Sequence, residues 1–151
     1  MKRTVVFDMA DTIYTTVKST QKQEQLGSQY KEMPQALDVF LDLFEQGYKI
    51  VIISNSIIQH SRQVLQKLLE MRGEDAEYIK QIFAKIDILT MQYFGTKHDS
   101  EAWKEAMSPY KNIDYIFEDG ENKLAAAGQA ARELGSNPDL YQKISDFYEL
   151  N

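Results

Sequence analysis

Four short segments of this chain carry side chains that could do chemistry at one edge of a sheet. The first is an apolar run over residues 4–7 that ends at Asp8, with Thr12 four positions later. A carboxylate at the end of a buried strand lies at the carboxyl edge of the sheet, where open α/β folds bind ligands. Asp8 is therefore a candidate nucleophile, since carboxylates can attack a substrate and form a covalent intermediate.

The other three segments offer groups that would complement such a nucleophile. Ser54 and Asn55 follow a second apolar run and provide a hydroxyl group with neighbouring backbone N–H groups. Lys97 provides a cation just before an expected helix, and Asp119 provides a further acid after a third apolar run. Together they predict one site with a nucleophile, a hydroxyl donor, a positive charge and a second carboxylate.

The elements that must position these groups follow from the hydrophobic pattern. Apolar runs of strand length alternate with segments of helical period, which predicts βαβ units around a mainly parallel sheet. Strands are expected at residues 4–8, 49–54, 86–90 and 113–118. Helices are expected from Pro34 to Gly47, at residues 57–71, 76–83, 99–107 and 121–134, and from Pro138 to about Tyr148.

This order of elements predicts a three-layer α/β/α, Rossmann-like domain with a mainly parallel sheet. A chain of 151 residues with 43% hydrophobic residues suits a single domain, over residues 1–151. Residues 15–31 are polar and form the one long irregular stretch, so residues 13–33 are a possible minimal cap or flap loop. Tyr14, Tyr30, Tyr93 and Trp103 are expected to pack in the protein rather than to stack on bases.

Composition and charge exclude several classes of function. A formal charge of -6 argues against broad contact with nucleic-acid phosphates, and we expect no nucleic-acid partner. The absence of cysteine excludes disulfides and thiolate metal sites. With no signal peptide or membrane span recognisable in the sequence, we expect a cytoplasmic protein that has no membrane partner.

Taken in order, the four segments resemble the motifs of the haloacid dehalogenase (HAD) superfamily, whose members are mostly Mg²⁺-dependent phosphatases and phosphotransferases. The run Val-Val-Phe-Asp8-Met-Ala-Asp-Thr12 resembles the first motif, an apolar strand followed by D-x-D-x-T. The segments at Ser54, Lys97 and Asp119 resemble the second, third and fourth motifs. The resemblance covers residues 4 to about 135 and implies a HAD-like fold.

The resemblance also implies a role for each segment. Asp8 would be the nucleophile of an Mg²⁺-dependent phosphatase that works through an aspartyl-phosphate. Asp8, the backbone carbonyl of Ala10 and Asp119 would bind Mg²⁺, which prefers oxygen ligands and usually takes one or two carboxylates.

The same resemblance assigns the phosphate-binding groups. Ser54, the N–H of Asn55 and Lys97 would hold the phosphoryl oxygens, and Ser54 and Lys97 would also serve catalysis. Phosphoryl transfer needs mainly an in-line nucleophile and neutralisation of charge on those oxygens, which these groups supply. The implied partner is a phosphorylated substrate whose identity the sequence does not give.

Two positions depart from the family pattern. Ala10 stands where the family usually has an Asp as general acid and base, a group worth about 10²–10⁴ in rate. Asp11 is adjacent but one residue out of register, so its side chain is expected to point elsewhere. Lys123 stands four residues after Asp119, where the family usually places another acid, and Glu118 and Glu121 are the alternatives for that carboxylate.

Other functions stay open. The D-x-A-x-T pattern also resembles phosphonatase-type members, but these use a Lys in a large helical cap, and the short stretch containing Lys18, Lys22 and Lys31 has no room for one. A degenerate domain that binds phosphate-containing ligands or a protein is a further alternative, and a two-component receiver domain is disfavoured because Asp8 lies on the first strand. In this superfamily, absence of a cap implies a macromolecular substrate or a neighbouring subunit as lid, so a homo-oligomer is possible.

Overall fold

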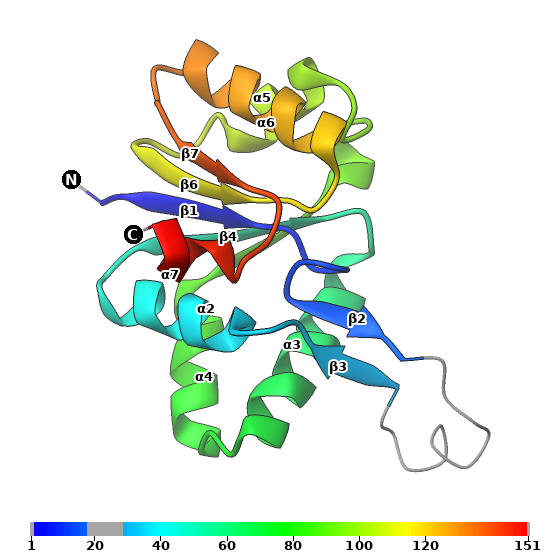
Figure 1. Ribbon diagram of the computed structural model, residues 1–151, viewed down its shortest axis with the longest axis vertical. Helices are drawn as coiled ribbons and strands as arrows, with labels where there is room; N and C mark the ends of the chain where they lie inside the picture. Colours follow the sequence, from blue (N-terminus) through cyan, green and yellow to red (C-terminus); the bar gives the residue numbers. More distant parts are fainter. Residues whose placement is uncertain (1, 18–28, 151) are drawn as a thin grey trace.

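The computed structural model describes residues 2–17 and 29–150 and contains a five-stranded parallel sheet. The strand order is β5-β4-β1-β6-β7, which places β1 at the centre (Figure 1). The strands are β1 (Thr4–Phe7), β4 (Lys49–Ser54), β5 (Asp87–Thr90), β6 (Ile113–Phe117) and β7 (Asp139–Tyr141). Because the strands run parallel, their carboxyl ends meet at one edge of the sheet.

Helices cover both faces of this sheet and give the expected α/β/α layers (Figure 1). The layer on one face contains α2 (Ala36–Glu45), α3 (Ile58–Arg72), α4 (Ala76–Lys85) and the short α7 (Asp146–Leu150). The layer on the other face contains α5 (Ser100–Met107) and α6 (Glu121–Glu133), preceded by the 3₁₀ turn η1 (Met91–Tyr93). The prediction of a Rossmann-like fold with a mainly parallel sheet is confirmed.

Side chains of the central strands alternate between two hydrophobic clusters. In β1, Val5 and Phe7 pack with α2 and α3, whereas Val6 packs on the opposite face with α5 and α6. The same alternation in β4 places Ile52 in the first cluster and Ile53 in the second. Since successive residues point to opposite faces and both faces are buried, the central strands read in sequence as continuous apolar runs.

A two-stranded antiparallel hairpin follows β1 at the carboxyl edge of the sheet. It consists of β2 (Tyr14–Thr16) and β3 (Tyr30–Glu32), and it projects beyond the end of β1 in Figure 1. The expectation that residues 15–31 are irregular is wrong at both ends of that stretch. Residues 18–28, including Lys18 and Lys22, lie outside the described part of the chain.

The predicted final helix from Pro138 is also wrong in its first half. Residues Asp139–Tyr141 form the edge strand β7, which pairs with β6, and α7 begins only at Asp146. The ring of Tyr141 stacks on Phe117 with 5.1 Å between centroids, so tertiary packing holds these three residues extended. A run this short carries no readable period.

Within the described ranges, no helix is both long and apolar enough to cross a membrane.

Candidate active site

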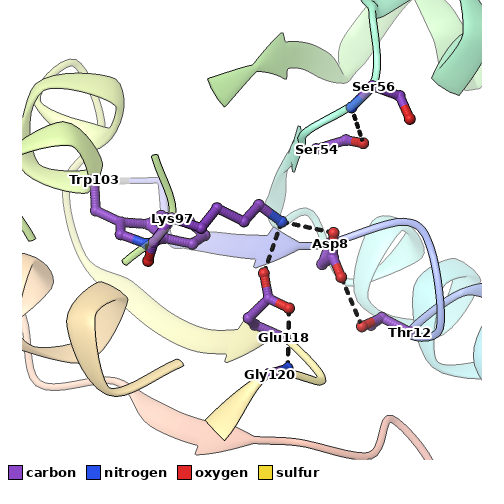
Figure 2. Close-up of polar contacts among 8 residues, drawn as sticks. All are labelled: Asp8, Thr12, Ser54, Ser56, Lys97, Trp103, Glu118 and Gly120. Atoms are coloured by element: carbon purple, nitrogen blue, oxygen red, sulfur yellow. Dashed lines mark hydrogen bonds and ion pairs between the residues drawn. The ribbon is translucent and has the colours of Figure 1, made fainter. Parts of the chain in front are cut away.

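A buried ion-pair triad lies at the carboxyl edge of the sheet (Figure 2). The ammonium nitrogen Nζ of Lys97 lies 2.6 Å from Oδ1 of Asp8 and 2.7 Å from Oε1 of Glu118. The three side chains are at most 8% exposed to solvent. One cation therefore bridges two carboxylates in a nearly dry environment.

The two acids of the triad come from adjacent strands. Asp8 directly follows β1, and its N–H donates to the carbonyl oxygen of Phe117 at 2.8 Å. Glu118 directly follows β6, and its N–H donates to the carbonyl oxygen of Tyr141 at 3.1 Å. The sheet hydrogen bonding thus continues past the strand ends and fixes the backbone position of both acids relative to the edge of the sheet. The side chain of Asp8 is held as well, because Thr12 Oγ1 donates to Asp8 Oδ2 at 3.2 Å.

Burial changes the proton affinity of Asp8. The pKa of Asp8 is raised from its ordinary 3.8 to about 7, mainly because desolvation disfavours the charged carboxylate; Lys97 lowers this pKa and the negative charge of Glu118 raises it. Two carboxylates and one ammonium group leave the triad one negative charge in excess when all three are ionised. Such a site favours a bound proton or a further cation.

A third carboxylate completes a cluster with the ligand chemistry of a hard cation. Carboxylate oxygens of Asp8, Glu118 and Asp119 lie within 4.8 Å of one another, with Asp119 exposed and the other two buried. Oxygen ligands of this kind suit Mg²⁺, which binds through one or two carboxylates and retains several waters. The residues therefore fit Mg²⁺. Ala10 is exposed and bridges to Tyr14, and the metal contact expected of its carbonyl stays a prediction.

Ser54 ends β4, next to β1, and is 2% exposed. Its Oγ accepts a hydrogen bond from the N–H of Ser56 at 3.0 Å, which leaves the hydroxyl proton free to donate to a ligand (Figure 2). The carbonyl oxygen of Asn55 accepts from Nε2 of Gln92 at 2.8 Å, which fixes the loop. The structure thus brings the residues predicted to bind phosphate, Ser54, Asn55 and Lys97, to the same sheet edge as Asp8.

The sequence left open where the side chains of Asp11 and Lys123 point, and the structure describes both. Asp11 has a left-handed backbone (φ 62°), is exposed, and accepts a hydrogen bond from Thr15 Oγ1 at 3.0 Å. Its side chain is not part of the triad. The aliphatic chain of Lys123 lies against Gly120, where a Cβ atom would come within 2.9 Å of its Cδ.

Sequence reasoning did not predict the observed roles of Glu118 and Trp103 around Lys97. Glu118 was one of two alternatives for the missing acid, and the structure places it against Lys97 whereas Glu121 begins α6. The sequence feature that could have indicated Glu118 is its position at the end of the strand, directly before Asp119. Trp103 was expected to pack and is 1% exposed, but its Nε1 also donates to the carbonyl oxygen of Lys97 at 2.7 Å. Tyr93, expected to pack, is 78% exposed.

The fold is similar to that of several solved structures. A HAD-superfamily hydrolase from Ehrlichia chaffeensis matches with a TM-score of 0.57 and 16% identity, over 99% of this chain and 95% of that one. D,D-heptose 1,7-bisphosphate phosphatase from B. bronchiseptica, in complex with magnesium and phosphate, matches with a TM-score of 0.54 and 12% identity, over 91% of this chain and 92% of that one. A Thermotoga maritima protein assigned as a beta-phosphoglucomutase matches with a TM-score of 0.55 and 13% identity, over 98% of this chain and 97% of that one.

These matches concern the fold: the α/β Rossmann-like architecture of this chain is similar to that of these solved structures, which include a HAD-superfamily hydrolase. No protein-family model and no curated protein sequence matches the chain. At identities of this size the likeness concerns architecture, so the chemistry must be argued from the residues of the site.

Proposed function

We infer that this protein is a Mg²⁺-dependent phosphatase that acts through an aspartyl-phosphate on Asp8. The observation that carries this proposal is the buried contact of Lys97 with both Asp8 and Glu118 at the carboxyl edge of a HAD-like sheet. A structural ion pair would need only one acid for one cation. The surplus carboxylate, with Asp119 beside it, is instead suited to a site that takes up a cation and a phosphate group together.

Asp8, Glu118 and Asp119, with the carbonyl of Ala10, would hold the ion. Bound there, Mg²⁺ would neutralise phosphoryl charge and favour the ionised form of Asp8. These residues suit Mg²⁺ because the ion prefers oxygen ligands, and all three side chains provide carboxylate oxygens.

The remaining residues have complementary roles. The ionised Oδ of Asp8 attacks phosphorus, the bond from phosphorus to the leaving oxygen breaks, and water later hydrolyses the acyl phosphate and regenerates Asp8. Lys97 holds Asp8 in place and offsets negative charge on the transferred group, and the Ser54 hydroxyl and the Asn55 N–H donate to its oxygens. Ala10 supplies no proton, so substrates with good leaving groups react faster unless another group donates.

A degenerate, ligand-binding protein is the second candidate, and Ala10 is the observation that favours it. Without the usual acid, the site could bind phosphate and Mg²⁺ and turn over negligibly. The phosphonatase alternative has less support, because the described residues of the 13–33 stretch include two β-strands and no helix that could carry a Schiff-base Lys.

Hydrolysis of p-nitrophenyl phosphate with Mg²⁺ separates the two candidates, because its leaving group needs no acid. We expect Mg²⁺-dependent release of nitrophenol that Asp8→Asn lowers by at least about a thousandfold, a loss in the range seen when a nucleophile is removed. Asp139→Asn, an exposed carboxylate at the start of β7, is the matched control and should retain full activity. Equal rates for the wild type and Asp8→Asn, with phosphate binding retained, would instead establish the binding protein.

A further inference from the structure

A small pocket opens beside the candidate active site, on the β7 side. It has a volume of about 300 Å³, at the lower end of the range for small-molecule sites. Three loops form it: the one after β1 contributes Asp11, the one before α2 contributes Met33 and Pro34, and the one after β7 contributes residues 142–145. Two of these loops begin at the sheet edge that carries Asp8.

A hydrogen bond links the lining of the pocket to the candidate metal site. Gln142, which lines it, donates a hydrogen bond from Nε2 to the carbonyl oxygen of Asp119 at 3.2 Å. Asp11, which also lines the pocket, comes only three residues after Asp8. The lining is therefore linked through Gln142 to Asp119 and through the loop after β1 to Asp8, which places the pocket beside the proposed phosphate position.

The residues that line the pocket indicate which chemical groups would bind in it. Met33, Pro34 and Ile144 provide apolar surface, while charges of opposite sign are present as Asp11 and Lys143. Opposite charges disfavour a strongly charged group of either sign. Neutral hydroxyl groups suit this lining best, because a hydroxyl can donate to a carboxylate and accept from an ammonium group.

Asp11 has the geometry to take part in such recognition. Thr15 Oγ1 donates to Oδ1 of Asp11, and Oδ2 has no hydrogen-bond partner among residues 2–17 and 29–150. The left-handed backbone at Asp11 turns the chain between β1 and the hairpin. The free oxygen is therefore held next to the pocket by a fixed local structure rather than by a long, flexible side chain.

We propose that this pocket binds the alcohol portion of a small, hydroxylated phosphomonoester, whose phosphate lies at Asp8 and whose hydroxyl groups contact Asp11, Lys143 and Ser145. This rests on the proposed function, because the phosphate must be held at Asp8. The substrate is then a small molecule, in contrast to a macromolecular substrate, which was one of the two alternatives expected for a capless HAD-like chain.

The absence of cysteine in this chain provides a direct test. Ser145→Cys, made in the inactive Asp8→Asn background, places a single thiol in the pocket, and its alkylation by iodoacetamide is followed by mass spectrometry. With Mg²⁺ present, saturating glycerol 3-phosphate should slow alkylation at least fivefold, whereas inorganic phosphate should not. Ser108→Cys, exposed after α5 in the opposite helix layer, is the matched control and should react at the same rate with either ligand.

Calorimetry measures binding of both ligands to the same protein, and binding of inorganic phosphate also to Ser145→Cys with Asp8 intact, because Asp8→Asn removes a proposed Mg²⁺ ligand. If no ligand binds to either protein, the proposed function fails and the pocket assignment fails with it. If both bind but glycerol 3-phosphate gives no protection, or inorganic phosphate protects equally, the pocket assignment alone is wrong. Filling the pocket with Ser145→Trp should weaken glycerol 3-phosphate at least tenfold and leave inorganic phosphate unchanged; an equal effect on both would also overturn the assignment.

Discussion

Trp103 Nε1 donates a hydrogen bond to the carbonyl oxygen of Lys97, and the Lys97 ammonium group lies 5.4 Å from the centre of the same indole ring. One side chain therefore holds Lys97 at both its backbone and its charged end. The ring face stabilises the cation, and the N–H satisfies a carbonyl that would otherwise lose its partner. Trp103 positions Lys97 without belonging to the site itself.

Trp103→Phe keeps an aromatic ring and removes the N–H. We expect the free energy of unfolding to fall by about 1–3 kcal/mol, the cost of a buried carbonyl left without a partner. Urea unfolding followed by far-ultraviolet circular dichroism measures the change. Tyr93→Phe, at a position that is 78% exposed, should have no effect. Equal stability of Trp103→Phe and wild type would show that the hydrogen bond contributes nothing.

Lys97→Met removes the cation from the triad and leaves two buried carboxylates facing each other. We expect a loss of about 3–5 kcal/mol, typical of breaking a buried pair by removing one partner. Lys104→Met is the control, because Lys104 is 37% exposed and lies 3.9 Å from Glu133. Such surface pairs contribute about 1 kcal/mol or less. Similar losses for the two variants in chemical denaturation would contradict the assignment of Lys97 to a buried site.

The raised pKa of Asp8 predicts how stability depends on pH without metal. The folded chain keeps a proton on Asp8 up to about pH 7, whereas the unfolded chain releases it near 3.8. The stabilisation is fully present below pH 4 and is lost as the pH rises toward 7, by up to about 1.4 kcal/mol per pH unit.

Comparison with Asp8→Asn isolates this contribution from other titrating groups. In EDTA, the wild type should lose more stability than Asp8→Asn between pH 4 and 7 in urea unfolding. Adding Mg²⁺ at pH 7 should reduce the difference, because a cation replaces the proton. Parallel curves for the two proteins in EDTA would mean that Asp8 is ionised throughout.

Asp11 is the carboxyl group that an alcohol in the neighbouring pocket would meet. If it donates the proton that Ala10 lacks, Asp11→Asn should lower kcat for glycerol 3-phosphate by about a hundredfold, within the usual range for a positioned acid. Turnover of p-nitrophenyl phosphate should change by less than threefold, because nitrophenolate leaves without protonation. Steady-state kinetics with both substrates make the comparison. Equal losses on both would assign Asp11 to structure rather than proton transfer.

Where the hydrophobic pattern was strong, the sequence predicted the fold closely. The strand predicted at residues 49–54 is β4, because both of its faces are buried and its apolar run is unbroken. The edge strand β7 was predicted as helix, because three residues carry no period and only pairing with β6 extends them. The hairpin was missed for the same reason, since β2 and β3 are three residues each.

For the candidate site, the sequence indicated which segments meet but not which side chains face inward. Asp119 stays a prediction as a metal ligand, and Glu118, one residue earlier, is the acid that contacts Lys97. That choice depends on the path of the chain after β6, which local pattern does not determine. The orientation of Asp11 likewise depends on a left-handed backbone that single-residue preferences do not predict for this position.

The central place of β1 in the sheet has a consequence for amide hydrogen exchange. Val5 and Val6 are fully buried, and their strand pairs with β4 on one side and β6 on the other. Their amides can exchange with deuterium only when the sheet separates, so their protection should equal the free energy of global unfolding. A ligand held at Asp8 stabilises only the folded chain and should slow exchange at the amides of Val5 and Val6 as much as it raises overall stability.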